Sequence, residues 1–260
     1  MLRLAANLST LFPERTLAER FDAAAAAGFR AVEMQFPYAL SPAEVRARLD
    51  ASGQELVLFN APPGDAARGE RGLAGLPDRE AEFRDSFALA LDYAGATGCP
   101  RIHVMAGLQI DADSRAEQLD RFRDNLAFAC DRAAEVGVTV MIEPINPVDV
   151  PGYLLRDNAT AVALMDALVR PNLRLQYDFY HQQIIAGDLA RRFDALIDRI
   201  GHVQIADNPG RHEPGTGEIS YDWLLAHVSA SAYDGWVGCE YLPSSGQGGA
   251  LDWARRHLGR

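Results

Sequence analysis

Short β-type runs alternate with longer amphipathic helical patterns along the whole chain, and this alternation limits the fold more than any other feature. The runs lie at residues 2–7, 31–36, 55–61, 101–107, 139–145, 173–179, 201–207 and 235–242. Strands separated by helices pair in parallel through right-handed crossovers. Eight such units close into a (β/α)8 barrel of the TIM type, so we expect one α/β barrel domain over residues 1–260.

Local signals at the segment boundaries agree with this reading. Ser41, Pro42 and Glu44 form a helix-capping start, and glycines stand where helix C-caps are expected. The alternative is a doubly wound open sheet, which needs a glycine-rich phosphate turn after its first strand, whereas LSTLFPER follows Asn7. The long Gly-, Pro- and Arg-rich loop at 60–78 is interpreted as a lid or substrate loop, with a plain surface excursion as the alternative.

Charge and composition exclude several classes of function. The formal net charge is −11 and all 25 basic residues are arginine, so the chain lacks both the basic surface of a nucleic-acid binder and a lysine for Schiff-base chemistry. The three cysteines are scattered, without a CxxC pair. We expect a soluble cytoplasmic protein with no export signal, no membrane partner and no nucleotide cofactor. The sequence leaves the oligomeric state open, a homo-oligomer included.

Four runs in the second half end on a carboxylate or an amide. These residues are Glu143 after VMI, Asp178 after LQY, Gln204 after HV and Glu240 after GWVGC. Side chains at the carboxyl ends of barrel strands face the active-site rim, and Pro144 holds Glu143 in extended geometry. Three carboxylates around one point repel each other, and a divalent cation relieves that repulsion. Oxygen ligands favour a hard ion, so we expect Mg²⁺ or Mn²⁺. For each residue alone, a solvated charge or an ion pair is the alternative, as for Glu33 and Glu55.

Histidines and one arginine are candidates for holding the substrate. His181 follows Asp178 by three residues, and His103 lies in the fourth run as either a core or a site residue. His202 should lie one layer deeper than Gln204 and support it. Arg211 lies in the constrained loop 208–219, where it can bind an anion. Asn7, at the end of the first run, completes the substrate-binding set of His181, Arg211, His103 and Asn7.

Motifs along nearly the whole chain resemble the hydroxypyruvate isomerase family within the xylose isomerase-like TIM barrels. They include LAANLSTLF, VLFNAPPGD, GERGLAGLPDRE, HVMAG, IEPIN followed by PGY, QYDFYHQQ and HVQIAD, and the most specific are PGRHEPGTGEI and GWVGCEY. The resemblance implies metal ligands at Glu143, Asp178, Gln204 and Glu240, with Glu143 and Glu240 as the acid/base pair. In related ketose epimerases the third ligand is usually histidine, and Gln204 matches the hydroxypyruvate isomerase branch.

The implied reaction interconverts hydroxypyruvate and 2-hydroxy-3-oxopropanoate through an enediolate. Two carboxylates that flank the substrate can move a proton between adjacent carbons, while a metal polarises the carbonyl. A small anionic hydroxy-keto acid is therefore the expected partner. The alternatives are a 2-oxo-tetronate isomerase, a ketose 3-epimerase, a metal-dependent DNA-repair nuclease on the same barrel and a non-catalytic sugar-acid-binding barrel. A nuclease would need more histidine ligands and a basic face.

Overall fold

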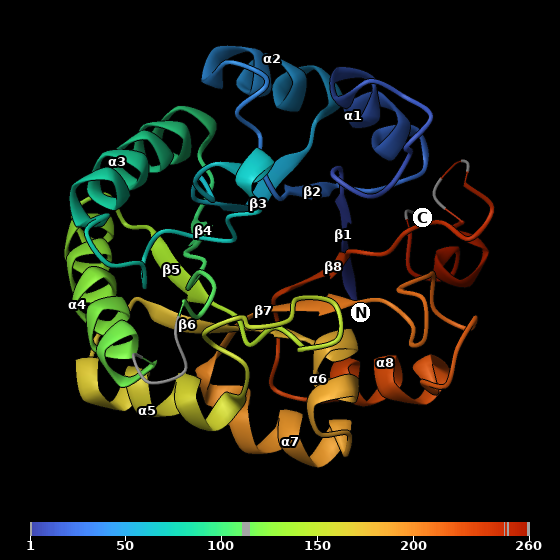
Figure 1. Cartoon of the computed structure of the whole chain (residues 1–260). Helices are drawn as coiled ribbons and strands as arrows, with labels where there is room; N and C mark the ends of the chain where they lie inside the picture. The colour runs from blue at the N-terminus through green and yellow to red at the C-terminus, as the bar shows by residue number, and fades with distance from the viewer. Residues whose placement is uncertain (1, 111–114, 247, 249, 259–260) are drawn as a thin grey trace.

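The computed structural model describes residues 2–110, 115–246, 248 and 250–258. Its strands close into a barrel in the order β1 to β8, and each strand pairs in parallel with its neighbours, β8 with β1 included. Figure 1 looks along the barrel, with the strands inside and the helices around them. The predicted (β/α)8 class is confirmed, and the doubly wound alternative is wrong because β1 and β8 are paired.

The strands coincide with the predicted runs, and all except β1 end before the predicted carboxyl end. They are β1 Arg3–Asn7, β2 Ala31–Met34, β3 Glu55–Asn60, β4 Arg101–His103, β5 Thr139–Ile142, β6 Leu173–Asp178, β7 Ile200–Ile205 and β8 Trp236–Cys239. Glu143 and Glu240 therefore lie one residue beyond their strands. At this end the chain leaves the sheet to build the loops that surround the barrel mouth.

The helices lie between successive strands and cover the outside of the barrel. They are α1 Leu17–Ala26, α2 Pro42–Ser52, α3 Glu80–Thr97, α4 Arg115–Ala134, α5 Asn158–Leu168, α6 Phe179–Ile185, α7 Leu189–Leu196 and α8 Tyr221–Ala230. Short 3-10 turns lie at η1 Ala66–Arg68, η3 Ile197–Arg199 and η4 Asp252–Ala254. The predicted cap of α2 is confirmed, because the Ser41 hydroxyl accepts the Glu44 N–H and Gly53 ends the helix with a φ of 68°.

Apolar burial holds the helices on the barrel. The main hydrophobic cluster joins the outward faces of the strands to the helices, with fully buried rings on α1, α3, α4 and α7 at Phe21, Phe87, Phe122 and Phe193. Burying one such ring contributes about 1.5–3 kcal/mol. A separate small cluster of Ala5, Ala31, Val57 and Trp236 comes from four barrel strands. No helix in the described part of the chain is long and apolar enough to cross a membrane.

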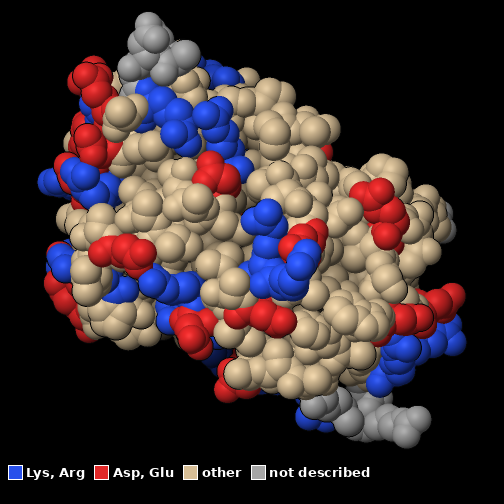
Figure 2. Space-filling model, turned by 90° about the horizontal axis from the view of Figure 1, so that it is seen from below, with Lys and Arg blue, Asp and Glu red and all other residues tan. Residues whose placement is uncertain are grey.

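The charges on the face drawn in Figure 2 are mixed in sign. Figure 2 shows the side of the molecule that lies at the bottom of Figure 1, where arginine and acidic side chains alternate. Surface arginines of the chain are paired with acids, such as Arg199 with Asp166 and Arg256 with Asp222. Such a surface does not concentrate the positive potential that attracts a phosphate backbone.

Candidate active site

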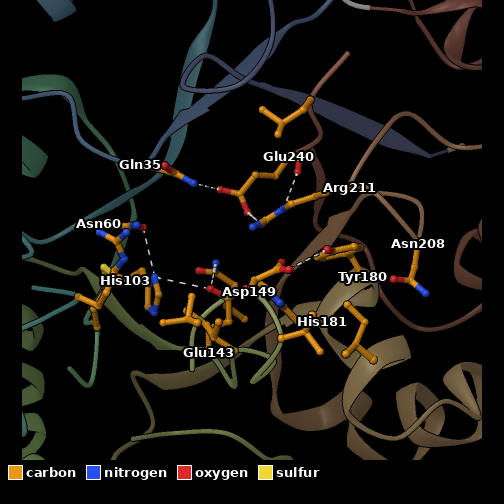
Figure 3. A pocket seen from close by; sticks show the side chains of 18 of the residues that line it. Gln35, Asn60, His103, Glu143, Asp149, Tyr180, His181, Asn208, Arg211 and Glu240 are labelled. Atoms are coloured by element: carbon orange, nitrogen blue, oxygen red, sulfur yellow. Dashed lines mark hydrogen bonds and ion pairs between the residues drawn. The ribbon is translucent and has the colours of Figure 1, made fainter. Parts of the chain in front are cut away.

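A cavity of about 930 Å³ opens at the carboxyl ends of the strands. Of the predicted residues, it is lined by His103, Glu143, His181, Arg211 and Glu240. Figure 3 shows Glu143 and Glu240 reaching this cavity from opposite sides. Asp178 and Gln204 are buried directly against the lining residues, since Asp178 contacts Arg211 and Gln204 contacts Gln176. The barrel therefore brings together the side chains that the sequence places at separate strand ends.

The oxygens of the four rim residues are linked in pairs by shared donors. Gln176 Nε2 lies 3.0 Å from Glu143 Oε2 and 2.6 Å from Gln204 Oε1. On the other side, Arg211 Nη2 lies 2.7 Å from Glu240 Oε2 and 3.4 Å from Asp178 Oδ2. Each donor can serve two acceptors because both acceptors lie within hydrogen-bonding range of one nitrogen.

Burial and mutual repulsion shift the acidity of the three carboxyl groups. Desolvation, followed by the charges of Asp178 and Glu240, raises the pKa of Glu143 well above its ordinary value. Desolvation raises the pKa of Asp178 to about 7 although Arg211 opposes the shift, and it also raises the pKa of Glu240. A raised pKa favours the protonated form of a carboxyl group, which is the form that a general acid needs.

Arg211 forms ion pairs with two carboxylates of this acidic cluster. Burial alone would lower its pKa, but the charges of Glu240 and Asp178 outweigh burial and raise that pKa. Its guanidinium also lies over the Tyr180 ring, with its Cζ 5.2 Å from the ring centroid. The backbone of Arg211 has a φ of 56°, in the left-handed region. Arg211 thus lines the cavity, as predicted, but two protein carboxylates already neutralise it.

One group of buried residues can hold a metal ion. Glu143, Asp178 and His181 each offer a ligand atom, and these atoms lie within 4.8 Å of one another. Oε1 of Glu143 is buried and has no hydrogen-bond partner among the described residues. An orphaned carboxylate oxygen in a crowded acidic cluster fits a divalent cation, which would satisfy the lone pairs and relieve the repulsion. The coarse prediction of a metal-binding group is supported.

The two predicted histidines at the site are both neutral. Burial lowers the pKa of His103 to about 3, and burial together with Arg211 and His103 lowers the pKa of His181 well below its ordinary value. His103 Nδ1 lies 3.2 Å from Asn60 Oδ1, and His103 Nε2 has no partner among the described residues. Of the two roles open to His103, the structure favours the site over the core.

A buried hydrogen-bond network supports the site from below. Glu33 accepts from His202 Nε2 at 2.6 Å, from Gln204 Nε2 at 2.8 Å and from Asn7 Nδ2 at 3.0 Å. His202 therefore lies one layer deeper than Gln204, as predicted. Glu33 is fully buried and is not a solvated charge. A side chain at Gly238 would collide with the Glu33 carboxylate, so the absence of a side chain on β8 makes room for it.

Asn7, predicted to contact the substrate, lies behind the described lining of the cavity. Asn7 Nδ2 lies 3.0 Å from Glu240 Oε1 as well as 3.0 Å from Glu33, and its Oδ1 accepts the Ser9 N–H. Its side chain is 1% exposed, and the residue is absent from the described lining of the cavity. Asn7 lies behind Glu240 because β1 ends beside β8 in the closed barrel. It holds Glu240 in place together with Gln35, which lies 2.8 Å from the same oxygen.

The loop at 60–78 contributes to the cavity through Pro63, Ala66 and Arg71. Its second half is fastened to the barrel, because Gly75 N–H donates to Ala106 and Gly107 N–H donates to the Arg71 carbonyl. The Arg71 side chain is exposed, and no ion pair or hydrogen bond engages its guanidinium within the described ranges 2–110 and 115–246. This arginine is a site residue that sequence reasoning missed.

Other missed residues are amides and a loop acid: Gln35, Asn60, Asn146, Asp149 and Gln176. Gln35 and Gln176 could have been found from strand alternation, since each lies two positions from a buried acid. Asn60 ends β3 and carries the same strand-end signal as the four predicted residues. Asn146 and Asp149 lie in an irregular turn, for which no periodic signal exists.

Comparisons with known proteins agree with the fold and the motifs. A family model described as xylose isomerase-like TIM barrel matches residues 21–258. The 2-oxo-tetronate isomerase of Cupriavidus necator is 52% identical over 100% of both chains. The hydroxypyruvate isomerase of Escherichia coli is 44% identical over 97% of this chain and 98% of that protein. A crystal structure from Brucella melitensis, described as an AP endonuclease of family 2, has a TM-score of 0.96 and 42% identity, with full coverage of both chains.

Proposed function

The chain belongs to the xylose isomerase-like TIM barrel family, and from this membership we propose that it is an isomerase of small hydroxy-keto acids. The proposed reaction interconverts hydroxypyruvate and 2-hydroxy-3-oxopropanoate. The observation that carries the proposal is the placement of two buried carboxyl groups, Glu143 and Glu240, on opposite sides of one cavity (Figure 3). Burial raises the pKa of both groups above the ordinary value of a carboxyl group, which favours the protonated form that a general acid needs.

The reaction moves a carbonyl by one carbon. One glutamate removes the proton from the carbon that bears the hydroxyl, and a proton is added to the former carbonyl carbon. The hydroxyl proton passes to the former carbonyl oxygen, so that the carbonyl and the hydroxyl exchange places. Glu143 and Glu240 exchange these roles when the direction reverses. Gln176 holds Glu143, while Asn7 and Gln35 hold Glu240, so each carboxyl group keeps its orientation through the proton transfer.

A divalent cation fits the same place. We propose Glu143, Asp178, Gln204 and Glu240 as its ligands, with Mg²⁺ or Mn²⁺ as the ion. The shared donors support this set, because Gln176 brings together the oxygens of Glu143 and Gln204, and Arg211 brings together those of Asp178 and Glu240. When bound, such an ion polarises the carbonyl and absorbs charge as the enediolate forms.

Arg71 is the proposed partner of the substrate carboxylate. Arg211 is already neutralised by Glu240 and Asp178, so it contributes less positive charge to a new anion. Arg71 lines the cavity without a described partner and can bind a carboxylate with two parallel hydrogen bonds. We keep Arg211 as a contact to the substrate oxygens nearest the carboxyl cluster. An arginine without a described partner at the cavity favours an acid over a neutral ketose.

The relatives divide between two substrates, and both remain candidates. A cavity of about 930 Å³ admits three-carbon and four-carbon acids alike, so its volume does not separate hydroxypyruvate from a 2-oxo-tetronate. The Brucella protein is described as an AP endonuclease, so nuclease activity has to be considered as well. The net charge of −11 and the mixed surface of Figure 2 disfavour binding to duplex DNA.

The test is a substrate panel followed in deuterated solvent. Hydroxypyruvate, a 2-oxo-tetronate, dihydroxyacetone and a six-carbon ketose are each incubated with the protein, and both turnover and incorporation of deuterium at carbon are measured. We expect turnover with deuterium incorporation for one or both acids and far less for the neutral ketoses. Preferred turnover of a ketose would support the epimerase alternative. Binding of an acid without any deuterium incorporation would indicate a non-catalytic barrel.

A further inference from the structure

The side-chain amide of Asn146 has only one chemically acceptable orientation. Asn146 is fully buried in the turn after β5, and its Oδ1 accepts the backbone N–H groups of Val148 at 3.0 Å and Asp149 at 2.9 Å. On the other side of the amide, Nδ2 lies 3.2 Å from Asp149 Oδ2 and 2.7 Å from His181 Nδ1. A flipped amide would point NH₂ at two backbone donors and oxygen at a carboxylate, so these contacts determine which atom is nitrogen.

This orientation determines the tautomer of His181. An NH₂ group only donates, so the Nδ1 atom that it contacts must accept. The backbone N–H of Asn146 is directed at the same Nδ1 from 3.4 Å, which again requires an acceptor there. A neutral imidazole carries one proton, and with Nδ1 unprotonated that proton lies on Nε2. Because Nδ1 accepts from these two donors, the ring is not the doubly protonated cation and is neutral.

The protonated nitrogen faces the site. His181 lines the cavity, and its Nε2 lies 3.9 Å from Glu143 Oε1 and 3.7 Å from Asp178 Oδ2. Both distances exceed a hydrogen bond, so neither carboxylate consumes the Nε2 proton. An N–H that points at a carboxyl cluster without bonding to it is available to a substrate oxygen. A nitrogen that carries a proton has no lone pair for a metal, so of the group Glu143, Asp178 and His181 only the two carboxylates remain as ligands.

We propose that Asn146 is a positioning residue that holds His181 as the Nε2-protonated tautomer, so that His181 donates to a substrate oxygen and does not ligate the metal. The role in catalysis rests on the proposed isomerase function. The enediolate oxygen gains negative charge, and a fixed donor at this place stabilises it. A neutral imidazole suits the task because it polarises the oxygen and keeps its own proton.

The direct test is the tautomer itself. In the full chain labelled with ¹⁵N-histidine, the couplings between ring nitrogens and carbon-bound ring protons identify which nitrogen is protonated, and the His181→Gln variant assigns the signals. We expect Nε2–H in the parent protein. A proton on Nδ1 of His181 would overturn the inference whatever the activity of the enzyme.

Two variants distinguish the effect of the Asn146 amide on the His181 tautomer from a general effect on the surrounding turn. Asn146→Asp keeps an oxygen for the Val148 and Asp149 N–H groups but turns an acceptor toward Nδ1, so His181 should change to the Nδ1-protonated form. Turnover should fall by about 10²-fold while KM changes little, as expected when a transition-state donor is lost. Asp149→Asn is the matched control, because both backbone donors still orient Asn146 and the tautomer should stay. An unchanged tautomer in Asn146→Asp would contradict the proposal.

Metal binding supplies a readout that does not depend on turnover. The affinity for Mn²⁺, measured by calorimetry, should change less than about threefold in His181→Gln but should fall by about 10-fold or more in Asp178→Asn. A loss of affinity in His181→Gln as large as in Asp178→Asn would make His181 a ligand and overturn the inference. If the parent protein shows the Nε2–H form but turns over none of the panel substrates, the proposed function fails while the tautomer assignment stands.

Discussion

Nη2 of Arg211 lies 2.7 Å from Oε2 of Glu240, so the arginine that the sequence suggested for the substrate is paired with a proposed catalytic carboxylate. The two residues come from neighbouring barrel segments, since Arg211 follows β7 and Glu240 follows β8. This pairing gives the two cavity arginines different proposed roles. Arg211 sets the charge and orientation of Glu240, and Arg71 is left to meet an incoming anion.

The first prediction separates these two roles. Arg71→Ala should raise KM for hydroxypyruvate by about 10- to 150-fold, the equivalent of 1.5–3 kcal/mol for a hydrogen bond to a charged group, with little effect on dihydroxyacetone. Arg211→Ala should lower turnover of every substrate, because Glu240 loses its partner. Arg68→Ala is the control, since Arg68 is exposed in the same loop and does not line the cavity. Equal losses for charged and neutral substrates in Arg71→Ala would contradict the assignment.

The second prediction concerns the acid/base pair. Glu143→Gln and Glu240→Gln keep the shape and an oxygen but cannot carry the proton, so turnover should fall by about 10²–10⁴-fold in each variant. Glu55→Gln is the matched control, because Glu55 is exposed at the start of β3, at the opposite end of the barrel. The measurement is exchange of the carbon-bound substrate proton with deuterated solvent. Exchange at the parent rate in either site variant would exclude that glutamate as the base.

Metal removal gives the third prediction. Exhaustive chelation should lower activity, and Mg²⁺ or Mn²⁺ should restore it, because the orphaned Glu143 oxygen and the repulsion among the carboxylates favour a cation. Thiol reagents should have little effect, since the three cysteines are buried and lie outside the cavity lining. Full activity in protein that elemental analysis shows to be metal-free would refute this requirement.

The fourth prediction is a pH dependence of stability in the metal-free protein. The pKa of Asp178 is about 7 when folded, compared with 3.8 for the unperturbed group, so the folded state binds the proton more tightly. Between about pH 4 and pH 7 the unfolded state therefore carries fewer protons, and the free energy of unfolding should fall as the pH rises. Urea unfolding at pH 5 and pH 7 measures the change. Asp178→Asn keeps the oxygen that caps Tyr180 N–H and should weaken the dependence.

The sequence predicts the barrel well and the site in part, for physical reasons that differ. Runs such as TVMI are continuous apolar segments because parallel strands are covered on both faces, and this leaves a strong local signal. Glu143 and Asp178 follow from their places at the ends of such runs. The pairing of Arg211 with Glu240 depends on a left-handed backbone conformation in a loop, and the contact of Asn146 with His181 depends on how one turn folds back. Neither contact produces a periodic pattern in the sequence from which it could be predicted.

Glu33 and Gly238 show what a closed barrel imposes on the replacement of residues. They are far apart in the sequence, yet the carboxylate of one occupies the space that a side chain of the other would need. Neither position is free to vary alone, because Gly238→Ala displaces the acid that orients Gln204 and Asn7, while Glu33→Ala leaves a void and unpaired donors. A change at one of the two positions therefore requires a compensating change at the other. A variant with a side chain at position 238 of β8 would also need a new arrangement of the buried hydrogen-bond network around Glu33.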